Sequence, residues 1–163
     1  MRLGLILQLV VLLAVANGTP VIVNKLLGRR WSFPLDGGAS FVDGQPVLGA
    51  SKTLRGILFA VLVTAASAPL LLGLEWKVGV AIGGGAMAGD LFSSFLKRRM
   101  HLLPSSRCTG LDQIPEALVP LLLCRHTLSL TALDIAVGVA IFFVGEVLLS
   151  VLFYKLHLRD RPY

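Results

Sequence analysis

The sequence predicts an all-α integral membrane protein, and three observations lead to this class. Mean hydropathy is +0.82. Apolar residues make up 55 % of the chain and charged residues only 15 %, whereas about a quarter of the residues are charged in a soluble domain. Several apolar runs also approach the length of a membrane span. Because the chain has only 163 residues, we expect one membrane domain that covers residues 1–163.

Five apolar segments are the predicted transmembrane helices. Their boundaries lie near residues 3–23, 54–74, 78–96, 114–130 and 131–156, with polar loops at about 24–53 and 97–113. The first segment has some features of a cleaved signal peptide, among them Ala14-Val15-Ala16. The basic residues that follow it favour a retained helix instead. Between the second and third segments, Trp76 is expected to anchor a tight turn at the membrane interface.

The last two segments differ in how clearly they are marked. The fourth is the weakest of the five, because Arg125 and His126 can be accommodated only near an interface. The fifth starts at a loose capping pattern formed by Thr131 and Asp134.

Basic residues are distributed unequally between the two sides of the predicted bundle. The two long loops and the C-terminal tail hold 12 of the 15 lysines and arginines, and the other three are Arg2, Lys77 and Arg125. Because basic residues favour the cytoplasmic side, we expect the N-terminus outside and both loops and the C-terminus in the cytoplasm of a cell membrane. This asymmetry explains the net charge of +6 without a nucleic-acid partner. The sequence also has no stripe of interleaved basic and aromatic residues.

An aspartate inside the third segment is the first candidate for a functional role. An aspartate in hydrocarbon costs roughly 2.5–3.5 kcal/mol, so Asp90 is expected to serve a function, with a salt bridge to another helix as the structural alternative. On a helix, Asp90, Ser93, Ser94 and Lys97 share one face. This combination suits a magnesium-bound phosphate at the membrane surface. Arg98 could contribute or could be a stop-transfer charge, and Glu146 raises the same question with less context.

Small residues in the third segment have a packing interpretation. Ala81, Gly85 and Gly89 recur at a spacing of four, which lets two helices approach closely. Such a ridge can place Asp90 firmly against a neighbouring helix, and it also permits a helix-mediated homodimer.

The first long loop contains a second group of polar residues. Asp36 and Asp43 lie in glycine-rich turns. The segment Ser51-Lys52-Thr53-Leu54-Arg55 then opens a predicted helix. Helix N-termini bind phosphate through free N–H groups, and Ser51 or Thr53 can cap the helix. The alternative is an ordinary loop with turn aspartates and a positively charged flank.

Together these residues resemble a known family of lipid enzymes. The matching blocks are Pro34-Leu35-Asp36, Phe41-Val42-Asp43-Gly44, Leu48-Gly49, Ser51-Lys52-Thr53, Arg55-Gly56, Gly89-Asp90, Ser94-Phe95, Lys97-Arg98-Arg99 and Leu111-Asp112-Gln113. In order and spacing they resemble the CDP-archaeol synthase family, which is similar to the phosphatidate cytidylyltransferases. The resemblance implies that a membrane lipid phosphate attacks the α-phosphorus of CTP and releases pyrophosphate, leaving a CDP-activated lipid.

The resemblance also implies a role for each matching residue. Asp90 and Asp112 match the acids that hold Mg²⁺, and together with Lys52 and Lys97 they form the implied catalytic set. The implied binding residues for CTP and the lipid phosphate are Ser51, Lys52, Thr53, Arg55, Ser94, Lys97 and Arg98, with Asp36 and Asp43 as loop acids of unassigned role. Ala39 and Ala50 stand where many relatives carry polar or charged residues. The His-Gly-Gly and Asp-Arg elements of the longer bacterial phosphatidate enzymes are missing, and only Asp112-Gln113 remains.

Two other classes of membrane protein fit part of the pattern. A CTP-dependent polyprenol or phytol kinase needs similar acids and bases, but it transfers the γ-phosphate to a lipid alcohol. A small non-enzymatic transporter could use Asp90 as a proton or cation site. The one-sided distribution of the charged residues argues against a transporter, because no polar path crosses the membrane.

Overall fold

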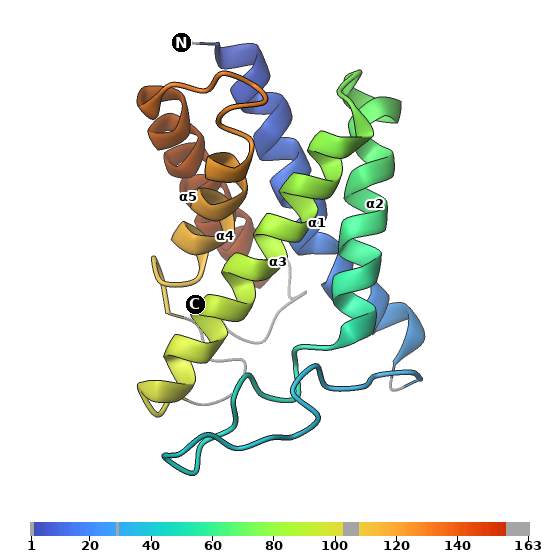
Figure 1. Cartoon of the computed structure of the whole chain (residues 1–163), viewed down its shortest axis with the longest axis vertical. Helices are drawn as coiled ribbons and strands as arrows, with labels where there is room; N and C mark the ends of the chain where they lie inside the picture. Colours follow the sequence, from blue (N-terminus) through green and yellow to red (C-terminus); the bar gives the residue numbers. More distant parts are fainter. Residues whose placement is uncertain (1, 29, 103–107, 156–163) are drawn as a thin grey trace.

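The predicted all-α class is confirmed by the structure of the chain, a computed structural model. It describes residues 2–28, 30–102 and 108–155, the last six of these by their backbone alone. The described residues form five helices, which are α1 (Leu3–Leu27), α2 (Leu54–Leu72), α3 (Trp76–Arg99), α4 (Gln113–Leu123) and α5 (Ala132–Lys155) (Figure 1). The first three predicted segments therefore agree with helices to within a few residues at each end.

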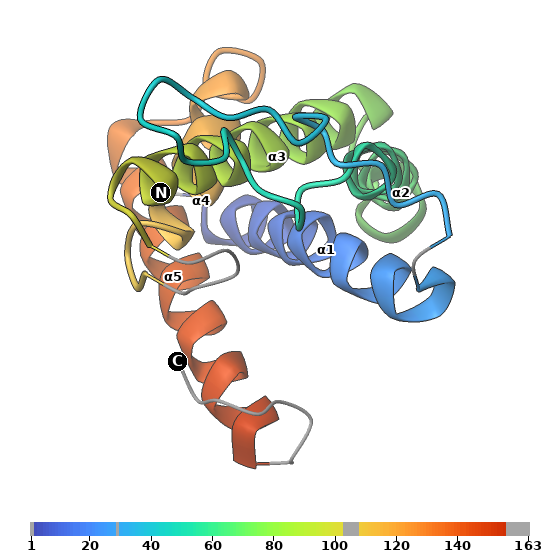
Figure 2. The same cartoon turned by 90° about the horizontal axis from the view of Figure 1, so that it is seen from below.

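Helix α3 lies at the centre of the bundle. It packs against α1, α2 and α4, while α1 and α4 also contact α5 (Figure 2). Buried Leu9, Leu12 and Leu13 of α1 meet Ile82 of α3 and Leu121 of α4 in one continuous core. The long loop between α1 and α2 crosses the end of the bundle at which α3 finishes (Figure 1).

Glycines of α3 allow two neighbouring helices to approach its backbone. A Cβ atom added at Gly79 would lie 2.5 Å from the carbonyl oxygen of Thr64 in α2. On the side of α4, a Cβ at Gly85 would lie 2.7 Å from the Cα of Pro120, and one at Gly89 only 2.2 Å from the carbonyl oxygen of Pro115. The ridge predicted from Gly85 and Gly89 is therefore used within the chain, to seat α4 on α3.

The fourth predicted transmembrane segment differs from the structure. Helices α1, α2, α3 and α5 are long and apolar enough to cross a membrane, but α4 has only 11 residues. At 1.5 Å per residue it is about 16 Å long, roughly half the thickness of the hydrocarbon core. Figure 1 shows it beside only part of α3. The prediction of a helix over 114–130 was therefore wrong in its second half, and five complete spans remain a prediction.

Hydrogen bonds to a turn explain why α4 ends early. After Leu123 the chain turns, with Leu130 N–H donating to the Arg125 carbonyl at 2.9 Å. The guanidinium of Arg2 donates to the carbonyl oxygens of Leu128 and Ser129. These bonds satisfy carbonyl groups that a continued helix would have used internally. The N-terminus of α1 thus fixes the connection between α4 and α5.

Candidate active site

The loop between α1 and α2 is closed on itself by Asp36. One carboxylate oxygen accepts hydrogen bonds from the N–H groups of Leu48 and Gly49, both at 2.9 Å, and the other accepts from Gly38 at 3.0 Å. Burial alone would raise the pKa of Asp36, but the N–H donors of Gly49, Leu48 and Gly38 outweigh it and hold the pKa below its ordinary value. Asp36, predicted as a loop acid without a role, therefore holds the loop in shape.

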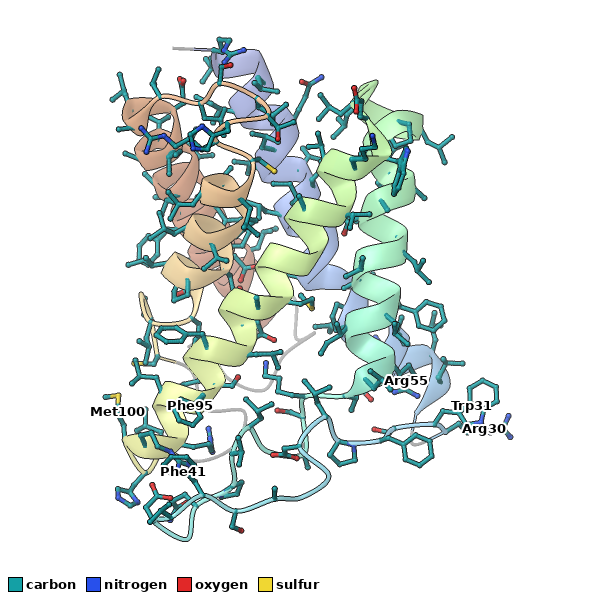
Figure 3. All side chains as sticks on the ribbon, in the orientation of Figure 1. Arg30, Trp31, Phe41, Arg55, Phe95 and Met100 are labelled. Atoms are coloured by element: carbon teal, nitrogen blue, oxygen red, sulfur yellow. The ribbon has the colours of Figure 1, made fainter. Side chains whose placement is uncertain are left out.

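A second contact attaches the loop to the end of α3. Arg99 forms an ion pair with Asp43 at 2.9 Å and donates to the Pro46 carbonyl at 2.7 Å. Its guanidinium also lies over the rings of Phe41 and Phe95, 4.5 and 5.0 Å from their centroids (Figure 3). Sequence reasoning named Arg99 only as part of the Lys97-Arg98-Arg99 block and missed this role. The Phe41-Val42-Asp43 block is thus a docking segment that places the loop against α3.

A third set of contacts positions the start of α2. Leu35 N–H donates to the Lys52 carbonyl at 2.8 Å, and Leu54 N–H donates to the Phe33 carbonyl at 3.2 Å. The Thr53 hydroxyl caps α2 by accepting from Gly56 N–H at 3.2 Å, as the sequence predicted. Ser51 is exposed beside it. Lys52 therefore lies on a short segment that is fixed on both sides.

Arg55 joins α2 to α1. It is 7 % exposed and donates to the Gly28 carbonyl at 3.0 Å, to the Asn24 side chain at 3.1 Å and to the Arg30 carbonyl. A cation at the C-terminal end of a helix satisfies carbonyl groups and complements the helix dipole. Arg55 is thus used to cap α1, although the resemblance implied contact with nucleotide phosphates.

The centre of the site is an ion pair between the loop and α3. The Lys52 ammonium lies 2.6 and 2.7 Å from the two carboxylate oxygens of Asp90. Both side chains are partly buried, with exposed fractions of 22 % for Lys52 and 23 % for Asp90. The structure therefore brings together two predicted site residues that are 38 positions apart in the chain. The structural alternative for Asp90 was a salt bridge to another helix, whereas this ion pair is made to the loop.

A second lysine–aspartate pair lies next along α3. Lys97 contacts Asp112 at 2.7 Å, and these side chains are 9 % and 17 % exposed. Asp112 also accepts from Cys108 N–H at 3.2 Å. Ser94 and Arg98 are buried on the same helix, at 3 % and 2 % exposure. Asp112 precedes α4, so this pair connects α3 to the start of α4.

Sequence reasoning missed one acidic residue of the site, Glu116. The close contact of Gly89 with Pro115 places the first turn of α4 beside Asp90. The Glu116 carboxyl group lies beside that of Asp90, and its other charged neighbours are Lys52 and Glu146. The signal was present in the sequence, because an acid in an apolar segment is costly and indicates a function, as it did for Asp90.

The carboxylates of the site fit the chemistry of Mg²⁺. Among the described residues, no three His, Cys, Asp or Glu side chains are grouped closely enough to form a metal site by themselves. Mg²⁺, however, is usually held by one or two carboxylates together with substrate phosphates. Asp90 with its neighbour Glu116, and Asp112 in the second pair, supply the hard oxygen donors that such a site requires.

Comparisons with known proteins identify the family of the chain. A family model described as "CarS-like: CDP-archaeol synthase" matches residues 3–163. The chain is 33 % identical over 154 residues to the CDP-archaeol synthase of Thermofilum pendens, covering 91 % of this chain and 76 % of the relative. Identity to the CDP-archaeol synthase of Sulfurisphaera tokodaii is also 33 % over 154 residues, covering 91 % and 89 %.

A solved structure described as "Structural insight into an intramembrane enzyme for archaeal membrane lipids biosynthesis" shares this fold. Its TM-score is 0.68 at 28 % identity, and the match covers 88 % of this chain and 91 % of that one. The family match and the identity to these relatives lead to one assignment, so the chain belongs to the CDP-archaeol synthase family.

Proposed function

We propose that this protein is a CTP-dependent cytidylyltransferase that converts a membrane lipid phosphate of the archaeol type to its CDP-activated form. Because the chain belongs to this family, it is a nucleotidyltransferase. Its long apolar helices make it a multi-pass membrane protein. One observation of the structure carries the proposal. Two lysine–aspartate pairs, Lys52–Asp90 and Lys97–Asp112, are formed by residues of α3 with the α1–α2 loop and with the start of α4. They lie towards the end of an apolar bundle, where we expect a lipid phosphate and a water-soluble nucleotide to meet.

The reaction needs positioning and neutralisation of charge more than covalent catalysis. An oxygen of the lipid phosphate forms a bond to the α-phosphorus of CTP, the bond from that phosphorus to the bridging oxygen breaks, and pyrophosphate leaves with the bonding electrons. The lipid phosphate is already ionised at neutral pH, so no general base is needed. Lys52 and Lys97 can stabilise the charge on the phosphates, as cations do in phosphoryl transfer.

The carboxylates are assigned to the metal. Asp90 and Asp112 would hold Mg²⁺, which when bound neutralises phosphate charge and orients the leaving group. Ser51 and the capped N-terminus of α2 offer a hydroxyl and free N–H groups to a phosphate. Ser94 and Arg98 lie near Lys97 on α3 and are proposed to help bind the same phosphate. Asp36, Asp43 and Arg55 contribute by fixing the loop that carries Lys52.

The side of the membrane follows from the basic residues. Lys25, Arg30 and the end of α3 lie at the same end of the bundle as the loop that carries Lys52 (Figure 3). Because basic residues favour the cytoplasmic side, we assign this end to the cytoplasm, where CTP is available.

The test uses purified protein, Mg²⁺ and CTP labelled on either the α- or the γ-phosphate. A panel of lipid phosphates and lipid alcohols is supplied in vesicles. Transfer of α-label to a lipid phosphate, with release of pyrophosphate, is the expected result. Transfer of γ-label to a lipid alcohol would identify a kinase instead, and the absence of lipid labelling across the panel would contradict both enzymes.

A further inference from the structure

A group of apolar and basic side chains projects from the bundle where α1 ends and the loop begins. It comprises Lys25, Leu26, Arg30, Trp31 and Phe33, which we call the interfacial patch. Leu26 is 77 %, Trp31 73 % and Phe33 68 % exposed. Figure 3 shows Arg30 and Trp31 at the edge of the molecule, directed away from the helices. None of these side chains is explained by the site described above.

The backbone of this segment is held in a conformation that a bulky residue rarely adopts. Trp31 has φ +53°, in the left-handed region, which costs of order 1–3 kcal/mol at a non-glycine residue. Arg30, the residue before Trp31, is fixed through both of its backbone polar groups. Its N–H donates to the Leu27 carbonyl at 3.1 Å, and its carbonyl accepts from Arg55. An exposed indole gains little from the protein in return for this strain. A gain is available where the indole lies in a membrane interface, the region that tryptophan prefers.

The charge of the segment identifies the partner. Residues 24–35 contain three basic residues and no acidic one. Aromatic rings beside basic groups at the end of a spanning helix match the headgroup region of an anionic membrane leaflet, where each basic residue contributes about 1 kcal/mol. The exposed face of α1 that leads to the patch is apolar, with Val21 and Ile22 at 60 % and 59 % exposure. The patch is therefore continuous with a surface that meets lipid tails.

The patch is connected directly to Lys52. The Phe33 carbonyl accepts from Leu54 N–H at 3.2 Å, and Leu35 N–H donates to the Lys52 carbonyl at 2.8 Å. We propose that the interfacial patch binds the anionic headgroup region of the leaflet on this side of the membrane and thereby sets the depth of Lys52. Phe33 is itself one of the paired residues, and Trp31 precedes it by two positions, so the loop cannot change depth without the patch.

Intrinsic fluorescence tests the binding, because the chain has only two tryptophans. Trp76→Phe leaves Trp31 as the single tryptophan, excited selectively over the two tyrosines, and Trp31→Phe leaves Trp76 as a reference. The variants are reconstituted in vesicles whose lipids carry bromine either near the headgroup or near the end of the acyl chain. Trp31 should be quenched strongly by the shallow bromine and weakly by aqueous iodide. Iodide quenching equal to that of free tryptophan amide, without bromine quenching, would overturn the proposal.

The contribution of the basic residues to binding is tested separately, by varying the fraction of anionic lipid. Raising the fraction of anionic lipid should increase bromine quenching of Trp31 in the Trp76→Phe protein, and Lys25→Gln with Arg30→Gln should remove this dependence. An unchanged dependence in that variant would exclude headgroup recognition by the basic residues.

The depth of the loop is measured separately from activity. A spin label at Ala50→Cys, in a Cys108→Ala background, reports accessibility to a water-soluble relaxation agent; Cys124 is buried and does not compete. Trp31→Gly removes the ring and suits the positive φ, so the fold is retained. The label should become more accessible in Trp31→Gly than in the background protein. Equal accessibility would overturn the link to depth whether or not the proposed transferase activity is found.

Discussion

Lys52 holds both carboxylate oxygens of Asp90, at 2.6 and 2.7 Å, although the two residues belong to a surface loop and to a central helix. The loop reaches this position because Asp36 closes it and Asp43 attaches it to Arg99. Removing either of the paired groups should therefore affect chemistry more than folding.

Asp90→Asn should lower kcat/KM for cytidylyl transfer by about 100-fold or more, the size expected when one electrostatic contact to the transition state is lost. The fold should change little, because a partly exposed ion pair contributes only about 0–1 kcal/mol. Labelled-CTP transfer and thermal unfolding in the same detergent check both statements. Asp90→Asn with full activity would rule out the metal assignment.

Lys97→Met should reduce both activity and stability. Its partner Asp112 is only 17 % exposed, so the change leaves a poorly solvated carboxylate, at a cost of about 1–3 kcal/mol. Lys97→Arg keeps the charge and is the matched control, with most of the stability expected to return. Unfolding of all three proteins in denaturant measures the difference, and equal stability of the Met variant and the unmodified protein would refute the pairing.

Gly89→Ala should displace α4. The added Cβ would meet the carbonyl oxygen of Pro115 at 2.2 Å, and overpacking of this kind costs about 1–3 kcal/mol. Because α4 carries Glu116 and follows Asp112, transfer activity should fall as well. Gly84→Ala lies on the same helix with nothing within 4 Å and should leave stability and activity nearly unchanged. Similar stabilities for the two alanine variants would contradict the close packing.

Glu116→Leu should lower activity by about 10-fold and raise the Mg²⁺ concentration needed for half-maximal rate, because it removes the carboxyl group that lies beside Asp90. Glu116→Gln retains a hydrogen-bonding side chain and should be affected less. Mn²⁺ binding followed by electron paramagnetic resonance provides a measure apart from activity. If the Leu variant bound Mn²⁺ and turned over like the unmodified protein, Glu116 would have no role in positioning Asp90.

Asp36→Asn should destabilise the loop in a pH-dependent manner. The pKa of Asp36 is lower in the folded protein than its ordinary value, so its contribution is fully present above the ordinary pKa. It is lost as the pH falls through the folded pKa, when the carboxylate is protonated. At neutral pH the variant should be less stable by about 1 kcal/mol, and this difference should shrink on acidification. A difference that is constant with pH would exclude the carboxylate as its cause.

Much of the site could be predicted from the sequence because its chemistry depends on residue types that are costly in a membrane. Asp90 was recognised in this way. The Ser51–Thr53 segment was recognised because it opens a helix, and Thr53 caps α2 as expected. Glu116 was overlooked although the same physical reasoning applied to it. Arg55 could not be placed, because a cation in the first turn of a helix suits a phosphate and the C-terminus of another helix equally well until the neighbouring helix is known.

The sequence by itself determined the all-α class and most helix boundaries, because apolar runs of spanning length and a capped helix start are local properties. It also predicted that most of the basic residues lie on the same side of the membrane as Lys52. Only the tertiary structure decided the pairing of Lys52 with Asp90 and of Arg99 with Asp43, and the early end of α4. The two pairings depend on where the folded loop docks on α3, and the end of α4 depends on the hydrogen bonds from Arg2 to the turn that follows it. Those are contacts between distant segments that no local pattern encodes.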